Sequence, residues 1–245
     1  AVGMADPRVR IVAALDRPGH PDLGTDVGTL AGLGPIGVPM TDSLSDDCSA
    51  DVLIDFSLPE AVPSAIELAV TRKLPLVIAT TGLTPELMDR IHEAASVVPV
   101  VQAPSMSLAV NLTMKLTEIA ARALADQDAD VEILERHHRF KEDAPSGTAL
   151  KFGQIVASVM GQTTVTHGRS GRPGKRPHNE IGYHAIRTGD NPGEHTILFG
   201  MSGETIELTV RASNRDCYAT GAFAAAMFIA DRSEGWYSMQ DVLGL

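Results

Sequence analysis

Short apolar runs alternate with amphipathic segments through the first half of the chain. The runs at residues 9–16, 50–57, 74–82 and 98–105 are mostly apolar, as buried strands are. Segments with the apolar spacing of helices follow at residues 59–72, 83–96 and 106–124. Mostly apolar strands that alternate with helices indicate a parallel sheet covered on both faces, so we predict a Rossmann-type α/β domain.

The pattern changes after about residue 126. A strand is expected at 130–138 and a helix at 145–160, before a loop rich in Gly and Arg. Gly turns then separate three further strands, at 181–190, 193–203 and 204–214, and a helix follows at 218–232. This order predicts a second, α+β domain with a mostly antiparallel sheet. The expected boundaries are 1–105 with 216–245 for the first domain and 106–215 for the second.

The head of the chain lacks the turn that a dinucleotide-binding fold normally carries. Such a fold opens with a strand, a G-x-G-x-x-G turn and a helix. Here "AVGMADP" is similar to the end of that helix, and no such turn precedes it. The first strand and Gly-rich turn are thus absent from this chain, and we expect roughly 20–30 further N-terminal residues in the natural protein.

Composition and charge narrow the class of protein. The formal net charge is −11, from 20 Lys+Arg against 31 Asp+Glu, which argues against nucleic acid as a partner. No apolar run is long enough to span a membrane, and no signal peptide is evident. Cys48 and Cys217 have no metal-binding spacing and fit free thiols. We expect a cytoplasmic protein.

Asp16 and Arg17 stand where a dinucleotide domain holds the adenosine ribose. An acid at the end of the first strand accepts hydrogen bonds from ribose hydroxyls, and a neighbouring Arg can meet a 2′-phosphate. Since both residue types are present, the choice between NADH and NADPH stays open. A solvated turn is the alternative interpretation.

Small and hydroxyl residues follow the next strands. "ATTG" at 79–82 and "APSMS" at 103–107 lie at strand tips, where parallel sheets bind ligands. Their size lets a flat cofactor approach the backbone. The alternative for the first is a helix cap, although Thr84 before Pro85 suits that role better.

The stretch "ERHHRFKEDAPSGTA", residues 135–149, carries the densest candidate chemistry. Neighbouring side chains on a strand point to opposite faces, so His137 and His138 are poorly placed to share a metal, and we expect none. An imidazole suits proton donation near pH 7, and Lys141 could also donate. A structural role remains the alternative for either histidine alone.

The same stretch also predicts an anion site. Arg136, His137, His138, Arg139 and Lys141 gather five basic side chains within six residues. Ser146-Gly147-Thr148 then opens a helix, whose free N–H groups bind carboxylate or phosphate. We therefore expect a small anionic substrate with a proton donor beside it. Arg169, Arg172, Lys175 and Arg176 form a second basic loop, which either folds over an anionic ligand or is simply solvated.

With these residues the chain resembles the dihydrodipicolinate reductases, also named 4-hydroxy-tetrahydrodipicolinate reductases, of bacterial lysine and diaminopimelate synthesis. Residues 135–149 match the family string E-x-H-H-x-x-K-x-D-x-P-S-G-T-A, and residues 51–60, 79–82, 103–111 and 181–199 resemble further family segments. The resemblance covers the whole chain. It implies hydride transfer from NADPH or NADH to a cyclic, imine-containing dicarboxylate, with loss of water, in a cytoplasmic homotetramer formed through the second-domain sheet.

The resemblance also implies residue roles. In the second domain, which would bind substrate and form the oligomer, His137 would be the proton donor and acceptor and Lys141 a second donor. His138, Gly147 and Thr148 would bind the substrate. In the first domain, which would bind the dinucleotide, the cofactor residues would be Asp16, Arg17, Ala79, Thr80, Thr81, Ala103, Pro104, Ser105 and Met106.

Three positions depart from the family pattern. Ala79 and Ala109 stand where Gly is usual, and Ser105 stands where Asn is usual. The methyl group of Ala79 reduces the space for the cofactor, and the missing Gly-rich turn leaves pyrophosphate binding without its usual residues. Two alternatives follow: another two-domain NAD(P)-dependent dehydrogenase of an amino-acid-derived acid, or a non-catalytic nucleotide-binding homologue.

Overall fold

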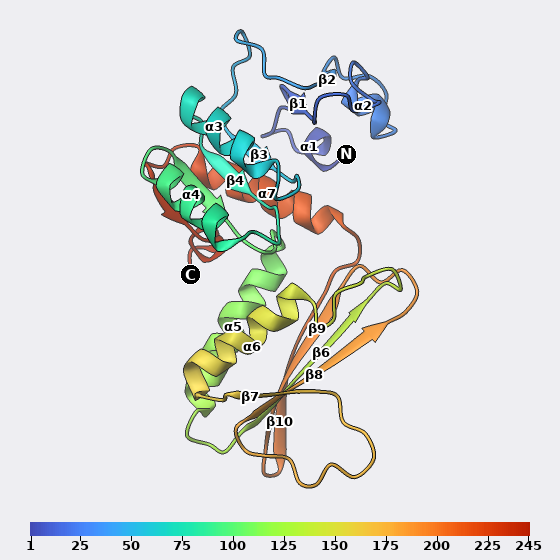
Figure 1. Cartoon of the computed structure of the whole chain (residues 1–245), viewed down its shortest axis with the longest axis vertical. Helices are drawn as coiled ribbons and strands as arrows, with labels where there is room; N and C mark the ends of the chain where they lie inside the picture. The colour runs from blue at the N-terminus through green and yellow to red at the C-terminus, as the bar shows by residue number, and fades with distance from the viewer. The chain divides into compact units, whose positions relative to one another are not determined.

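The computed structural model describes residues 1–245, which divide into two compact units. The first unit joins Ala1–Met106 to Tyr218–Val242, and the second comprises Ser107–Cys217 with Leu243–Leu245. Each unit has its own sheet and its own apolar core (Figure 1). The units are therefore described separately.

The first unit is built on a four-stranded parallel sheet. Its order is β11-β5-β4-β3, and every neighbouring pair runs parallel. The strands are β3 (Leu53–Asp55), β4 (Leu76–Ile78), β5 (Pro99–Gln102) and β11 (Gly235–Tyr237). The longer helices are α3 (Val62–Arg72), α4 (Pro85–Ala95) and most of α7 (Asp216–Ile229), and the short α8 (Met239–Leu243) follows β11. The predicted Rossmann-type sheet is confirmed, while β11 was not expected from the sequence.

The first predicted strand, residues 9–16, is much shorter than expected. Only β1 (Ala14–Leu15) pairs, and its partner is β2 (Met40–Thr41) in a separate two-stranded sheet. An apolar run becomes a strand only where a neighbour supplies hydrogen bonds, and here the partner segment is equally short. Two one-turn helices lie in the same region, α1 (Val2–Ala5) and α2 (Val27–Leu30).

The second unit is built on a five-stranded mixed sheet in the order β10-β9-β6-β8-β7. Its strands are β6 (Asp130–His137), β7 (Thr164–His167), β8 (Glu180–Arg187), β9 (Glu194–Met201) and β10 (Glu204–Arg211). The β10–β9 and β9–β6 pairs are antiparallel, whereas β6–β8 and β8–β7 are parallel. The expected mostly antiparallel sheet is therefore mixed, because the helix that follows β6 returns the chain in the same direction.

Two helices cover one face of this sheet (Figure 1). They are α5 (Leu108–Leu124) and α6 (Gly147–Met160). Along β6, Val131 and Ile133 are completely buried under the helices, and the alternating Glu132 and Leu134 are partly exposed on the other face. Phe152 of α6 and Phe199 of β9 are the largest completely buried side chains of this core.

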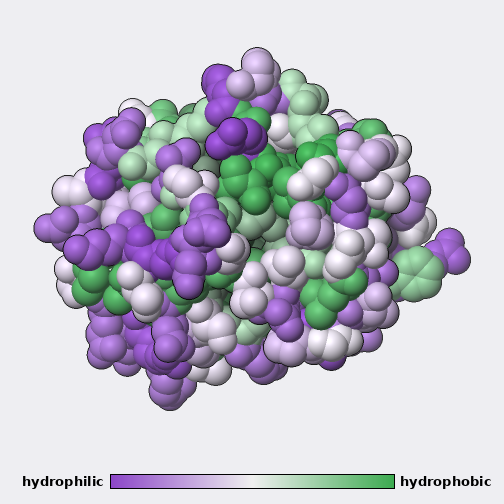
Figure 2. Space-filling model, turned by 90° about the horizontal axis from the view of Figure 1, so that it is seen from above, coloured by the Kyte–Doolittle hydropathy of each residue, from purple (hydrophilic) through white to green (hydrophobic).

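The surface mixes apolar and polar side chains. On the face drawn in Figure 2, patches of hydrophobic residues lie among hydrophilic ones. The most exposed large apolar side chains are those of Phe140 and Leu58, and scattered exposure of this kind is ordinary for a globular protein. None of the helices combines the length and the apolar character needed to cross a bilayer.

Phe152 tests the packing of the second unit. Phe152→Ala removes a buried ring between α6 and the sheet, and we expect the free energy of unfolding to fall by about 3–5 kcal/mol. Phe140→Ala is the matched control, because the Phe140 side chain is 79% exposed and should change stability by less than about 0.5 kcal/mol. Urea denaturation measures both. Equal losses would contradict the position given to Phe152.

Candidate active site

The predicted signature runs from the end of β6 through a loop to the start of α6. His137 ends β6 and pairs in register with Arg187 of β8. Glu135 lies two residues earlier on the same face, since side chains alternate along a strand. Both side chains are buried. The sheet thus places an acid, an imidazole and a guanidinium side by side.

Glu135 is the centre of this arrangement. Its Oε2 contacts Nδ1 of His137 at 2.5 Å and Nη1 of Arg187 at 2.7 Å. Its Oε1 accepts from Nη2 of Arg187 at 2.8 Å and from the backbone N–H of Ser146 at 3.1 Å. Each carboxylate oxygen therefore has two partners, which satisfies a buried charge.

The ionisation of Glu135 follows from these contacts. Burial raises the pKa of this carboxyl, but the hydrogen bonds from His137, Arg187 and Ser146 outweigh it and lower the pKa to about 2. The carboxylate is negative at neutral pH and can only accept hydrogen bonds. Nδ1 of His137 must then carry the hydrogen of their shared bond.

A second buried histidine, His195 of β9, lies beside the first. Its ring meets that of His137 edge to face, with centroids 5.2 Å apart, and its Nε2 is 3.1 Å from Oγ of Ser146. Burial, together with the smaller effect of the neighbouring His137, lowers the pKa of His195 to about 4. His195 is therefore neutral at pH 7.

The start of α6 offers hydrogen-bond donors. Ser146 is its N-cap, and Oγ of Ser146 accepts from the N–H of Ala149 at 3.2 Å. The N–H groups of Gly147 and Thr148 precede the first intrahelical bond and have no partner. No atom lies within 4 Å of where a Gly147 Cβ would stand, so an anion can approach. The helix expected after Ser146 is present, and its first N–H groups are free to donate to a ligand.

The other basic side chains of the signature do not gather at this point. Arg136 lies on the opposite face of β6, 3.6 Å from Glu194, because neighbours on a strand alternate. Arg139 is exposed. Lys141 binds Asp143 through Nζ at 2.7 Å. The expected five-residue basic patch is thus dispersed, which leaves His137, His138 and Lys141 as candidates.

His138 differs from its neighbour. Its ring is only partly buried, yet its Nδ1 is shielded from solvent and has no hydrogen-bond partner. A shielded imidazole nitrogen without a partner is uncommon and suits a residue that completes its bonding with a ligand. His137 and His138 have different environments, and no group of His, Cys, Asp or Glu in the chain has metal-site geometry.

The candidate cofactor residues lie in the first unit, at the carboxyl ends of its strands. Asp55 ends β3, and its two carboxylate oxygens each accept a hydroxyl at 2.5 Å, from Ser57 and from Thr80. The N–H of Ala79 donates to the backbone oxygen of Asp55 at 2.8 Å. Asp55 therefore fixes the "ATTG" tip against β3. Thr84 caps α4, as the sequence predicted.

The remaining cofactor candidates are placed as follows. Ala103, Ser105 and Met106 are buried after β5, and Pro104 and Thr81 are exposed. Asp16 and Arg17 are both exposed directly after β1, and the N–H of Arg17 donates to Oδ1 of Asp16 at 2.7 Å. The strand tips present small side chains and hydroxyls, which fits a flat nicotinamide ring and ribose hydroxyls.

Two of the four cations of the second basic loop are paired with carboxylates. Arg169 contacts Glu132 and Glu180, and Arg176 contacts Glu132 at 3.0 Å and Asp130 at 2.6 Å. These pairs attach the loop to β6 and β8. Arg172 and Lys175 are the loop cations without a carboxylate partner.

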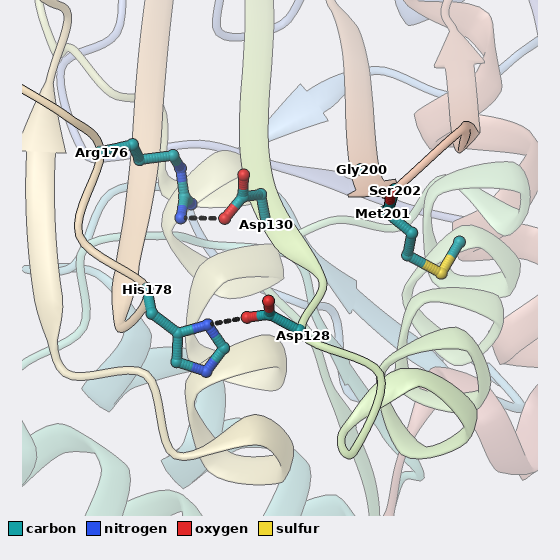
Figure 3. A pocket seen from close by; sticks show the side chains of 7 residues that line it. All are labelled: Asp128, Asp130, Arg176, His178, Gly200, Met201 and Ser202. Atoms are coloured by element: carbon teal, nitrogen blue, oxygen red, sulfur yellow. Dashed lines mark hydrogen bonds and ion pairs between the residues drawn. The ribbon is translucent and has the colours of Figure 1, made fainter.

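An open hollow of about 510 Å³ lies at the start of β6 (Figure 3). Its charges are already paired, since Arg176 meets Asp130 and His178 meets Asp128, each at 2.6 Å. It lies roughly 23 Å along β6 from His137, by the usual rise per residue. We therefore place the candidate active site at the other end of the strand.

Four residues of these networks were not singled out from the sequence: Glu135, Arg187, His195 and Asp55. Strand alternation could have placed Glu135 on the face of His137. Arg187 and His195 lie far along the chain on β8 and β9, and no local pattern connects them to β6. Only the register of the sheet brings them together.

Comparison with known proteins gives a consistent result. The family described as "Dihydrodipicolinate reductase, N-terminus" matches residues 2–106, and "Dihydrodipicolinate reductase, C-terminus" matches residues 109–243. A 4-hydroxy-tetrahydrodipicolinate reductase of Rhodopirellula baltica is 54% identical over 100% of this chain and 90% of its own length. One of Alkalilimnicola ehrlichii is 50% identical over 100% and 92%.

Solved structures agree with this. A dipicolinate-bound dihydrodipicolinate reductase from Paenisporosarcina sp. TG-14 has a TM-score of 0.76 and 26% identity, covering 98% of this chain and 91% of its own. An amine dehydrogenase from Mycobacterium smegmatis, at 13% identity and a TM-score of 0.58 over 94% of this chain and 88% of its own, shares the fold alone.

The neutral state of His195 predicts a pH dependence of stability. Unfolded His195 takes up a proton below pH 6.5, whereas the folded residue does so only near pH 4. The unfolded state therefore binds more protons in this window, and the free energy of unfolding falls by up to about 3 kcal/mol as pH drops from 6.5 to 4. His195→Gln should flatten that slope, measured by urea denaturation at a series of pH values.

The control replaces an exposed imidazole. His178→Gln removes a surface histidine and should keep the wild-type slope. A His195→Gln variant as steep as the wild type between pH 6.5 and 4 would show that His195 is not held neutral.

Proposed function

The chain belongs to the dihydrodipicolinate reductase family, and we propose that it reduces 4-hydroxy-tetrahydrodipicolinate to tetrahydrodipicolinate with NADPH or NADH, in lysine and diaminopimelate biosynthesis. The single observation that carries the proposal is the signature at residues 135–149. There the imidazole of His137, hydrogen-bonded to the carboxylate of Glu135, lies at the end of β6, and N–H groups without a partner lie at the start of α6. This pairing suits a small anion that must also receive a proton.

The residues divide the chemistry among them. One carboxylate of the substrate would bind the N–H groups of Gly147 and Thr148. His138 would form a hydrogen bond to the substrate through Nδ1, which has no partner within the protein. His137 would deliver or accept the proton through Nε2, because Nδ1 is engaged by Glu135. Lys141 would be the second proton donor. The reduced nicotinamide supplies the hydride when it is bound.

The cofactor would be held by the first unit. Thr80, Thr81 and Ala79, with Ala103–Met106, would line the nicotinamide half, since they surround the carboxyl ends of β4 and β5. Asp16 would accept from the adenosine ribose, and Arg17 would meet a 2′-phosphate. An acid beside a cation at this strand end supports use of either nucleotide.

The second-unit sheet would also form the oligomer. Its face opposite α5 and α6 carries no covering helix (Figure 1), and β10 is largely exposed. We infer a homotetramer through this face, in the cytoplasm, where Cys48 and Cys217, which form no disulfide, would stay reduced.

Other functions fit less well. A different dehydrogenase of the same fold would not need the whole string from Glu135 to Ala149. A non-catalytic nucleotide-binding homologue would not need a buried carboxylate that fixes one nitrogen of His137. Both alternatives predict no nucleotide oxidation with substrate supplied by the preceding synthase reaction.

Turnover tests the proposal directly. The purified protein should oxidise NADPH or NADH, followed by absorbance, only when the preceding synthase supplies substrate. His137→Gln should lower kcat by about 100-fold or more and change KM much less, because proton transfer occurs in the transition state. An unchanged kcat would remove His137 from this role, and no turnover with either nucleotide by the wild type would contradict the function.

The Asp16-Arg17 pair tests cofactor choice. Arg17→Ala removes the cation proposed for the 2′-phosphate, so KM for NADPH should rise about tenfold while KM for NADH stays within about twofold. Initial rates at varied nucleotide give both constants. Equal changes for the two nucleotides would show that Arg17 does not contact the phosphate.

A further inference from the structure

Glu135 is the most buried acid of the second unit, with a side chain 1% exposed. A lone carboxylate in such a position would be strongly unfavourable, and this one has four N–H partners from three segments of the chain. All of these partners are groups of the protein, so Glu135 itself has no oxygen left for a substrate. The question is what such a closed arrangement does for the residues around it.

The first consequence concerns the imidazole. A carboxylate that only accepts hydrogen bonds requires the hydrogen of His137 to be on Nδ1. Nε2 is then the nitrogen able to exchange a proton with a substrate. The ring of His195 also packs edge to face against the ring of His137. Both the hydrogen position and the orientation of the ring are therefore set by its surroundings.

The second consequence concerns the loop that carries Lys141. The guanidinium of Arg187 binds both oxygens of Glu135 and also donates to the backbone oxygens of Lys141 at 3.3 Å and Asp143 at 2.5 Å. One planar group thus connects the carboxylate to the loop after β6. The five donors of a guanidinium allow this, whereas the compact ammonium of a lysine would not span the same partners.

We propose that Glu135 and Arg187 are positioning residues for the reduction: Glu135 orients His137 so that Nε2 transfers the proton, and Arg187 fixes both Glu135 and the Lys141 loop. The inference rests on the proposed role of His137. In the step, His137 begins as the imidazolium, with the Nδ1 hydrogen donated to Glu135 and a proton taken from solvent on Nε2. The Nε2 proton passes to the substrate and leaves the neutral ring with its hydrogen on Nδ1, and Glu135 stays ionised throughout. Neither positioning residue gains or loses a proton.

The same strand provides a matched control. Glu132 lies three residues before Glu135 on the other face of β6, and it too binds a histidine and arginines. Its Oε2 is 2.7 Å from Nε2 of His184, and its side chain is 21% exposed. Opposing charges hold the pKa of both carboxyls near 2 against burial, which raises it. Glu132 therefore reproduces the ion pairing of Glu135 away from the proposed site.

A double-mutant cycle separates positioning from simple structural support. Glu135→Gln keeps the shape of the side chain and removes its charge, and we expect kcat to fall about 10- to 100-fold with KM within about threefold. In a His137→Gln background the same change should lower kcat by less than about twofold, because its effect passes through His137. Glu132→Gln should leave kcat within about twofold at an unchanged oligomeric state, measured by light scattering.

Each remaining outcome has a defined meaning. Equal losses from Glu135→Gln in both backgrounds, or an equal loss from Glu132→Gln, would overturn the inference while leaving the reductase function in place. A fully active His137→Gln would overturn the inference together with the role of His137. A wild type without turnover would overturn the proposed function and everything that rests on it.

Folding is the other concern, because breaking a buried ion pair is destabilising. Circular dichroism and thermal unfolding identify a variant that does not fold. Arg187→Lys is then the second test, since it keeps the charge but not the planar fork. It should lower kcat about tenfold in the wild-type background and by a smaller factor with His137→Gln, where only its effect through the Lys141 loop remains. A fully active Arg187→Lys would exclude Arg187 from the positioning role.

Discussion

The buried charge of Glu135 is the constraint on which the proposed active site depends. A carboxylate out of contact with water is stable only when its oxygens are fully hydrogen-bonded and its charge is balanced. Here the partners come from β6, from β8 and from the start of α6. The register that pairs His137 with Arg187 and the cap that begins α6 must both form for the charge to be accommodated. Fold and site are therefore specified by the same contacts.

The two compact units have similar hydrogen-bonded arrangements at their strand ends. In the second unit Glu135 fixes His137, and in the first Asp55 binds Ser57 and Thr80 and thereby fixes a strand tip. In both cases a buried acid at or near the end of a strand organises residues proposed to meet a ligand. Such groups restrict side chains to one arrangement before anything binds, which reduces the entropy lost on binding.

Much of this could be predicted from the sequence, and the reasons for the exceptions are physical. The alternation of apolar strands with amphipathic helices was sufficient for the parallel sheet, Thr84 caps its helix as expected, and a helix begins at Ser146-Gly147-Thr148 as expected. The mixed second sheet was missed because strand direction depends on how the connections cross, which local patterns do not report. The strand at 9–16 was overestimated because an apolar run does not reveal whether a partner exists.

The signature shows the same limit at the level of single residues. Its composition indicated a basic patch, but alternation along β6 sends Arg136 to the opposite face. Glu135, two residues away, binds His137 directly, but Arg187, which binds Glu135, lies about fifty positions away and meets them only through the sheet. The residue types in the signature indicated the chemistry. The pairing of strands that lie far apart in the sequence sets the geometry of the site.

Nitrogen-15 NMR of the histidine rings tests the central claim most directly. Long-range proton–nitrogen correlations, assigned by comparison with the His137→Gln spectrum, report which ring nitrogen of His137 carries the hydrogen when the ring is neutral. An ionised Glu135 requires Nδ1 to be protonated and Nε2 to be bare. A neutral ring with its hydrogen on Nε2, or an equal mixture of the two forms, would contradict the account.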